Sequence, residues 1–244
     1  MSQGKSIPQE LISVVAVPAV VLAILFCTAW AEQTPDAKAP YPSMAPVEQY
    51  LMSDRIAEIA LARSAAPESI SGDAEVLVLG RHGYETAVKG KNGFVCIVQR
   101  SWTAGTDDPN FWNPKLRAPI CFNPPAARSY LPFTIKKTEL ILAGESKAQM
   151  IETIKAALDK NELPKPEAGA MCYMMSKEGY LDDRAGPWHP HLMFFVSPMN
   201  AAIWGADLPG SPILATDDPL DGLTIFLVPV AKWSDGTTDS PHAH

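Results

Sequence analysis

Apolar residues along this chain gather in short runs, and polar stretches rich in proline separate the runs. Six runs of five to eight residues are typical of strands: 74–79, 84–88, 94–99, 170–175, 192–196 and 223–230. Apolar positions at helical spacing predict helices over 46–64, within 126–143 and from Ser146 to about residue 162. This order predicts an α+β fold, with one antiparallel sheet of about five to six strands and two or three helices packed on one face.

Local signals sharpen several of these elements. Ser146 and Gln149 form an S-x-x-Q capping box, which is typical of a helix start. The Asn92-Gly93 step favours a tight hairpin, so the strands between 74 and 99 are expected to form an antiparallel meander. The run FVCIV is apolar on both faces, which predicts a central strand. The first helix is expected to bury a stripe of four side chains, Met52, Ile56, Ile59 and Ala60.

The first thirty-one residues have the organisation of a secretory signal peptide. A polar start is followed by the uninterrupted apolar run Leu11–Phe26 and by Ala29-Trp30-Ala31, an A-x-A pattern. The run has about sixteen residues, fewer than the roughly twenty that span a bilayer. We expect cleavage after Ala31 and a periplasmic or secreted mature chain with no membrane span. An uncleaved N-terminal anchor is the alternative.

The remaining chain divides by composition into three parts. Residues 32–45 are polar and rich in proline, which predicts a flexible segment. Residues 46–233 contain all the strand-like and helical patterns and are expected to form a single α+β domain. Residues 234–244 are polar and contain histidine, and we expect a disordered tail.

Charge excludes two classes of partner. The formal net charge is −7, and the chain has no cluster of lysine and arginine. It therefore lacks the positive surface that binding to nucleic acid or to anionic lipid requires. The partner expected from the sequence is an unknown small molecule or a component of the cell envelope.

Three cysteines follow the predicted cleavage site: Cys96, Cys121 and Cys172. In an oxidising compartment two of them are expected to pair, and the spacing allows three pairings. We favour Cys96–Cys121, which would attach a proline-rich loop to a strand and leave Cys172 as a buried thiol. A catalytic role for Cys121 is the alternative, because it precedes a segment that could open a helix.

The stretch Gly179–His191, GYLDDRAGPWHPH, carries the richest set of polar groups. If His189 and His191 lie in extended backbone, their imidazoles point to the same side and could share a divalent metal, with His82 as a third ligand. The alternative is that Trp188 and both histidines cap the start of a buried strand. We also predict ligand-binding roles for Asp182, Arg184 and Trp188 of this stretch.

Two further groups are candidates for ligand binding. Arg81, His82 and Tyr84 follow the first predicted strand, where His82 could act as a general base and Arg81 could pair with an anion. Trp102 and Trp112 stand in the long loop 102–127, and loops of this length often carry binding groups. The alternative for the first group is an exposed polar turn, and for the tryptophans it is packing of the loop onto the sheet.

Four segments of this chain, DAEVLVLGRHGYETA, NGFVCIVQRSW, GAMCYMMSKEGYL and WHPHLMFF, resemble a group of uncharacterised exported bacterial proteins. The resemblance extends from about Pro46 to Asp235. It implies a bacterial, signal-bearing origin and no particular activity or catalytic residue.

Three functions are compatible with the sequence. The first is a periplasmic or extracellular ligand-binding domain with a site formed by the 178–191 loop. The second is a metal-assisted hydrolase that uses His189, His191 and His82. The third is a structural or interaction protein of the envelope, for which we expect an exposed apolar patch and no pocket.

Overall fold

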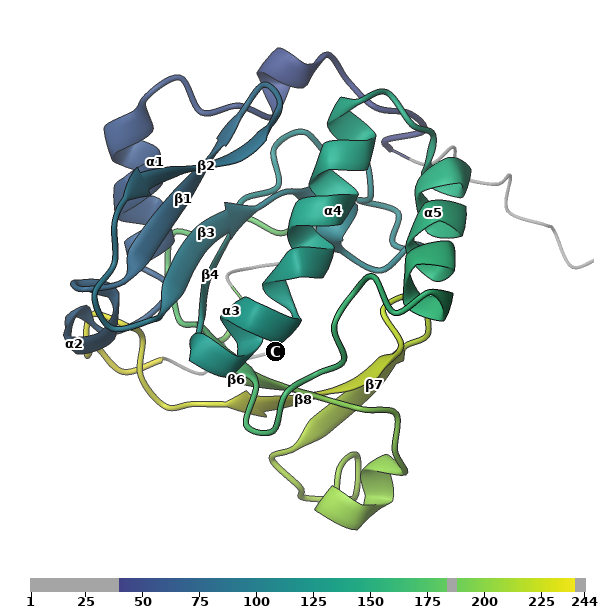
Figure 1. Cartoon of the computed structure of the whole chain (residues 1–244). Helices are drawn as coiled ribbons and strands as arrows, with labels where there is room; N and C mark the ends of the chain where they lie inside the picture. Colours follow the sequence, from purple (N-terminus) through teal and green to yellow (C-terminus); the bar gives the residue numbers. More distant parts are fainter. Residues whose placement is uncertain (1–39, 184–187, 240–244) are drawn as a thin grey trace, which may run out of the picture. The chain divides into compact units, whose positions relative to one another are not determined.

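The computed structural model describes residues 40–183 and 188–239. The predicted signal peptide, residues 32–39, Arg184 and residues 240–244 lie outside this part of the chain. The described residues form an α+β structure built on a mixed eight-stranded sheet (Figure 1). The strands lie in the order β2-β1-β3-β4-β5-β6-β8-β7. No helix among these residues has the length and apolar character needed to cross a bilayer.

The strands, in chain order, are β1 (Glu75–Gly80), β2 (Gly83–Val88), β3 (Val95–Gln99), β4 (Ala118–Phe122), β5 (Met171–Met174), β6 (His191–Val196), β7 (Leu214–Asp218) and β8 (Leu223–Pro229). The α-helices are α1 (Arg55–Arg63), α2 (Glu68–Ser71), α3 (Pro124–Ser129), α4 (Leu131–Leu142) and α5 (Lys147–Asp159). Three short 3-10 helices are η1 (Val47–Gln49), η2 (Ser101–Thr103) and η3 (Ala201–Trp204). The α+β class and the six predicted strands are therefore confirmed, and β4 and β7 are additional.

The expected antiparallel meander is wrong in one respect. Strand β3 pairs with β1 in parallel, through Glu75↔Val95 and Val76↔Cys96, and does not pair with β2. The Asn92 side chain closes a local turn, because its Oδ1 accepts a hydrogen bond from the amide of Phe94. Gly90 passes so close to the start of β1 that a Cβ there would lie 2.2 Å from the Glu75 nitrogen. The segment therefore crosses β1 and adds β3 on its other side.

Helices cover both faces of the sheet, whereas the sequence predicted helices on one face. Helix α1 contacts β1, β3 and β4, and helices α3 and α4 lie on the opposite face (Figure 1). All five residues of β3 are buried, as are all five of β4, which confirms that β3 is central. Strands buried on both sides need apolar cover on both sides, so a single helical layer could not complete this core.

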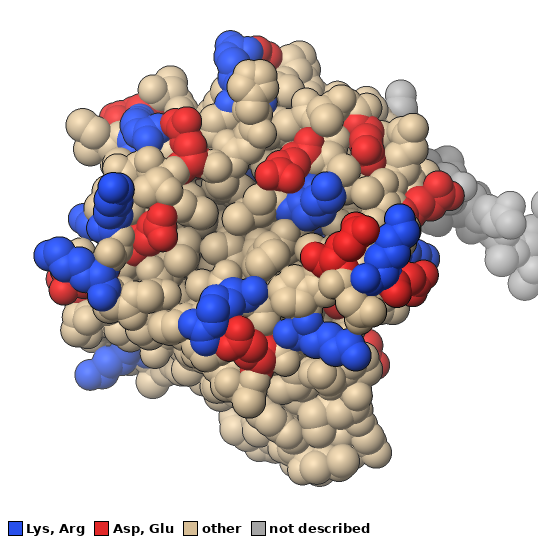
Figure 2. Space-filling view, viewed as in Figure 1, with Lys and Arg blue, Asp and Glu red and all other residues tan. Residues whose placement is uncertain are grey.

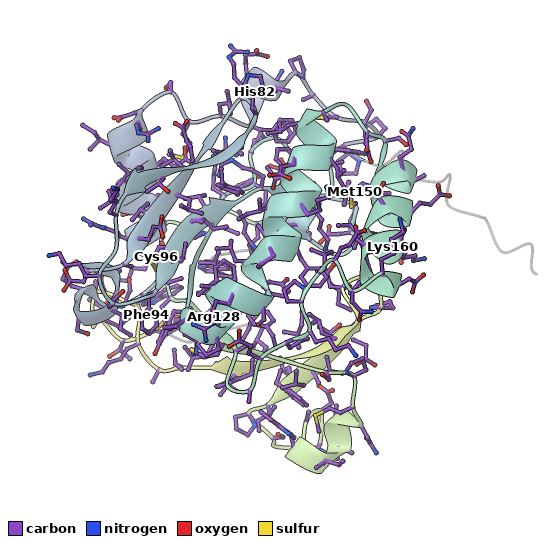
Figure 3. The ribbon with its side chains drawn as sticks, in the orientation of Figure 1. His82, Phe94, Cys96, Arg128, Met150 and Lys160 are labelled. Atoms are coloured by element: carbon purple, nitrogen blue, oxygen red, sulfur yellow. A yellow bond between two sulfur atoms is a disulfide. The ribbon has the colours of Figure 1, made fainter. Side chains whose placement is uncertain are left out.

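The predicted first helix consists of two separate pieces, η1 and α1. The Asp54 side chain starts α1 by accepting hydrogen bonds from the amides of Ile56 and Ala57. The buried side chains of α1 are Glu58, Leu61 and Ala62 rather than the predicted stripe, and Ile56 is 78% exposed. Helix α5 begins as predicted, with the capping box of Ser146 and Gln149 formed in both directions. Figure 3 shows Met150 on the side of α5 that faces α4.

The predicted disulfide Cys96–Cys121 is present, and Cys172 is a free, buried thiol. Cys96 and Cys121 are direct register partners on β3 and β4, so the bond joins two strands and not a loop to a strand. Burial raises the pKa of the Cys172 thiol well above its usual range. Cys121 carries no free thiol in this state, so its alternative role as a nucleophile is not supported.

Two ion pairs are buried in the core. Arg100 Nη2 lies 2.7 Å from Glu58 Oε1, and Lys137 Nζ lies 2.8 Å from Asp221 Oδ2. The second pair connects α4 to the turn between β7 and β8. Burial raises the pKa of Asp221 to about 6, although Lys137 acts in the opposite direction.

The segment 197–213 has an unusual surface. It contains one charged residue, Asp207, and several large apolar side chains that are exposed. On the face drawn in Figure 2, no basic or acidic atoms are visible on the protruding part at the bottom of the view, which contains η3. Both kinds are mixed over the rest of this face. The exposed large apolar side chains of this segment are Ile203, Trp204 and Leu208. Leu214, the first residue of β7, is also exposed.

Replacing Lys137 by methionine is expected to destabilise the fold by about 3–5 kcal/mol, because Asp221 would stay buried without a partner charge. The double variant Lys137→Met/Asp221→Leu should recover more than half of this loss, since it removes both charges. Urea unfolding followed by circular dichroism measures both. The control is Arg128→Met, which breaks the exposed Arg128–Glu167 pair and should change stability little. Equal effects of Lys137→Met and Arg128→Met would contradict the prediction.

Candidate functional site

One face of the sheet carries a cavity of about 540 Å³ over strands β5, β6, β8 and β7. Its floor follows from strand register, because side chains of register partners lie on the same face. Met174 pairs with His191, Met193 pairs with Leu227, and Ile225 pairs with Thr216. All six of these residues line the cavity.

The cavity lies where the helical cover of this face ends. Tyr130, between α3 and α4, stacks on Phe195 of β6 with ring centroids 3.9 Å apart, and this pair fills the face next to the cavity. Beyond it, two loops rather than a helix stand over the strands. The first wall comprises residues 103–108, from the last residue of η2 into the loop after it. The second comprises residues 216–220, from the last three residues of β7 into the turn before β8.

The third wall comes from the stretch that the sequence singled out. Leu181, Trp188 and His191 all line the cavity. Trp188 donates its indole hydrogen to the carbonyl of Ser176 and meets the His191 ring edge-on, with centroids 5.5 Å apart. Gly179 permits this position, since a Cβ there would lie 2.6 Å from the Trp188 ring.

His191 lines the cavity, and one of its two ring nitrogens is already hydrogen-bonded. Its side chain is buried, with 8% exposed, and its Nδ1 lies 2.7 Å from the carbonyl oxygen of His189. A carbonyl can only accept, so Nδ1 carries the hydrogen and Nε2 of the neutral ring keeps a lone pair. Burial lowers the pKa of His191, which favours this neutral form. Nε2 is the ring nitrogen that remains for a ligand.

The structure does not bring the three predicted metal ligands together. His189 is exposed and its Nδ1 lies 2.6 Å from Asp239 Oδ2, whereas His191 is turned into the cavity. His82 is in the β1–β2 turn at the outer end of that hairpin (Figure 3). Strands β1 and β6 are four strand spacings apart, on the order of 19 Å. Within 40–183 and 188–239, no group of three or more His, Cys, Asp or Glu side chains could hold a metal ion.

Most of the other predicted ligand-binding residues have structural roles. Arg81 is exposed and pairs with Glu48. The Tyr84 hydroxyl donates to the carbonyl of Val98 at 2.8 Å, and burial raises the pKa of Tyr84 well above its usual range. Trp102 is fully buried and donates to Thr138 Oγ1 at 3.0 Å.

Four predicted ligand-binding residues remain. Arg184 lies outside the described residues, and the other three differ in their position relative to the cavity. Trp112 packs edge-on against Phe111 outside the cavity, and Asp182 is next to Leu181 in the chain but outside the lining. Trp188 is the predicted ligand-binding residue that the structure places in the cavity.

The sequence did not predict the residues that form the floor of the cavity, nor the wall that is formed at the end of β7. Met174, Met193 and Ile225 could be assigned to one face only once the pairing of β5, β6 and β8 was known. The wall 103–108 belongs to the long loop in which a binding role was expected. Strand β7, LATDD, has no apolar pattern that would reveal it.

Comparison with known proteins found no matching family model, curated protein or solved structure. The resemblance to exported bacterial proteins therefore stays a prediction. The proposal of function therefore rests on the cavity and on the side chains that line it.

Replacing His191 by glutamine is expected to make stability less sensitive to mild acid. Because the pKa of His191 is lower in the folded chain than the unfolded value of about 6.5, acidification below that value favours the unfolded state, which binds the proton more readily. The stabilisation that comes from a neutral, buried His191 is present above pH 6.5 and is lost as the pH falls. The His191→Gln variant has no such contribution. Urea unfolding at pH 7.5 and pH 5.5 measures the difference.

The control is His82→Gln, since His82 is exposed on a turn. Between pH 7.5 and pH 5.5, the His82→Gln variant should lose as much stability as the wild-type chain does. The prediction fails if His191→Gln behaves in the same way as His82→Gln.

Proposed function

We propose that this chain is a binding domain for a small, largely apolar molecule, which is held in the cavity over β5, β6 and β8. The observation that carries the proposal is the set of apolar side chains that strand register gathers on the cavity floor around buried polar groups. A volume of about 540 Å³ is within the range of small-molecule sites.

Two buried polar groups in the cavity support binding rather than packing. His191 is 8% exposed and Tyr130 is 6% exposed, and both line the cavity. Among the described residues, neither the Tyr130 hydroxyl nor His191 Nε2 has a hydrogen-bond partner, and neither is among the fully enclosed side-chain atoms that lack one, so both atoms are accessible to solvent. Each can therefore form a hydrogen bond to water or to a ligand. These atoms would fix the orientation of a bound molecule.

We further propose that the chain acts in the periplasm or outside the cell after removal of residues 1–31. The pattern of the first thirty-one residues supports export. The disulfide between Cys96 and Cys121 supports an oxidising compartment, because such bonds are rare in reducing ones.

A second candidate function is interaction with the cell envelope. The specific observation is that three large apolar side chains, Ile203, Leu208 and Leu214, are exposed within twelve residues of the chain, with Ile203 at 74% exposed. Apolar side chains that gather on a surface are typical of sites that contact another molecule. This function does not exclude a ligand in the cavity, because η3 packs Trp204 against Phe226, on the face of the sheet opposite to the cavity floor.

Titration with N-phenyl-1-naphthylamine, a neutral apolar fluorophore, tests the cavity. We expect saturable binding at one site per chain, with the emission shift that an apolar environment produces. Met193→Trp and Leu227→Trp should each abolish binding by filling the floor. The control Ile203→Trp adds the same side chain on the exposed surface and should bind as the wild type does. If both floor variants are folded by circular dichroism and still bind, the cavity is not the site.

Fractionation of a bacterium that expresses the full chain tests location. We expect a product whose first residue is Glu32, released with the soluble periplasmic proteins. Retention in the membrane fraction, reversed by Ile203→Ser/Leu208→Ser, would favour the envelope function. A product that starts at Met1 and stays in the cytosol would overturn the export proposal.

A further inference from the structure

The cavity has a polar end between β3 and α4. Gln99 of β3 pairs in register with Ala118 of β4, and both residues line the cavity. The Gln99 side chain reaches α4, where its Nε2 donates to Thr134 Oγ1 at 3.2 Å. Tyr130 precedes Thr134 by four residues at the start of α4, and side chains at this spacing lie on the same side of a helix. Gln99 and Tyr130, defined here as the polar end, therefore belong to the same part of the lining.

Each residue of the polar end keeps one hydrogen-bonding atom that no described protein group uses. Gln99 and Tyr130 are both more than nine-tenths buried, and both line the cavity. Among the described residues, neither Gln99 Oε1 nor the Tyr130 hydroxyl has a hydrogen-bond partner. Neither atom is among the fully enclosed side-chain atoms that lack a partner, so solvent reaches both. Since the cavity is the open space that these buried residues line, a ligand in it can reach the same two atoms.

The two atoms offer complementary hydrogen bonds. Gln99 Oε1 is a carbonyl oxygen, which can only accept. Burial raises the pKa of Tyr130 well above its usual range, so the Tyr130 hydroxyl keeps its hydrogen and can donate. A head group that donates one hydrogen bond and accepts another, as an alcohol does, finds a partner for each at the polar end.

The buried charges near the polar end are already paired. Arg100 follows Gln99 in the chain, but its guanidinium is bound to Glu58 of α1, which covers the other face of the sheet. Lys137 of α4 lies 2.8 Å from Asp221, so these two charges compensate each other. A charged head group at the polar end would lose its hydration and meet neutral partners, which costs free energy.

The carboxylates of the lining belong to its walls and offer a charged ligand little. Asp107, Asp108 and Asp218 are each exposed or half-buried, so their charges stay hydrated. Asp217 directs its carboxylate to Thr224 Oγ1 at 2.7 Å. Attraction between exposed charges is weak and is screened by salt, so a cation at these walls would gain little.

We propose that the cavity selects apolar molecules with one uncharged head group that both donates and accepts hydrogen bonds, such as an alcohol, and that Gln99 and Tyr130 bind this head group. The head donates to Gln99 Oε1 and accepts from the Tyr130 hydroxyl, while the apolar body lies on the sheet floor. This inference rests on the proposed function, because it assigns the class of ligand that the same cavity binds. It predicts selectivity among molecules of equal apolar size.

Octanol and heptyl methyl ether provide matched probes, since they are isomers and the ether can accept a hydrogen bond but cannot donate one. Displacement of N-phenyl-1-naphthylamine measures the affinity of each. We expect octanol to bind about five- to tenfold more tightly than the ether, the effect of one hydrogen bond. Octanoate and octylammonium should each bind at least about tenfold more weakly than octanol, because each brings a charge to neutral partners.

Two variants separate the two hydrogen bonds. Gln99→Met removes the acceptor and keeps the length of the side chain, so octanol and the ether should bind within about twofold of each other. Tyr130→Phe removes the hydroxyl and keeps the stack on Phe195, so both probes should weaken by a similar factor and keep their order. The control Tyr173→Phe removes a tyrosine hydroxyl on the α1 side of the sheet and should bind both probes as the wild type does.

Each outcome bears on a different claim. Equal affinities of the wild type for octanol and the ether, or tighter binding of octanoate or octylammonium than of octanol, overturn the inference about the head group and leave the binding function in place. A preference for octanol that persists in folded Gln99→Met also overturns it, as does fluorophore binding that octanol does not displace. Absence of fluorophore binding from the folded wild type overturns the proposed function itself.

Discussion

The guanidinium of Arg100 is fully buried, and it joins elements that lie far apart in the sequence. It pairs with Glu58 of α1 and donates to the carbonyls of Tyr50 and Val98. An unpaired buried charge would cost several kcal/mol, so separating Arg100 from these partners would be strongly unfavourable. Because the chain continues from Arg100 into η2 and the loop 103–108, this network also fixes one wall of the cavity.

The opposite wall depends on buried charge in the same way. Lys137 of α4 holds Asp221, which directly follows the wall residues 216–220. The cavity therefore lies between two loops that are each attached to the core by an ion pair, and its floor is part of a continuous sheet. Under the proposed function, a site on such supports would be largely formed before a ligand arrives, which would reduce the ordering cost of binding.

Local patterns determined what the sequence could predict. The capping box at Ser146 and the apolar runs of six strands depend on neighbouring residues alone, and they were found. Strand β4 contains Pro119 and follows a proline-rich loop, so it had the composition of a connection. The parallel pairing of β1 with β3 depends on the path of Gly90 across β1, which no local pattern encodes. For the cavity, the sequence identified Trp188 and His191, while Tyr130 and Met193 join them only through tertiary packing and register.

The position of the disulfide has a consequence for how the sheet is assembled. Cys96 and Cys121 are direct partners on β3 and β4, and a slip of one residue would place the two sulfurs on opposite faces. Within the folded sheet, the bond is therefore compatible with this alignment and not with a slip of one residue. Once formed, it holds the two most buried strands in their correct alignment.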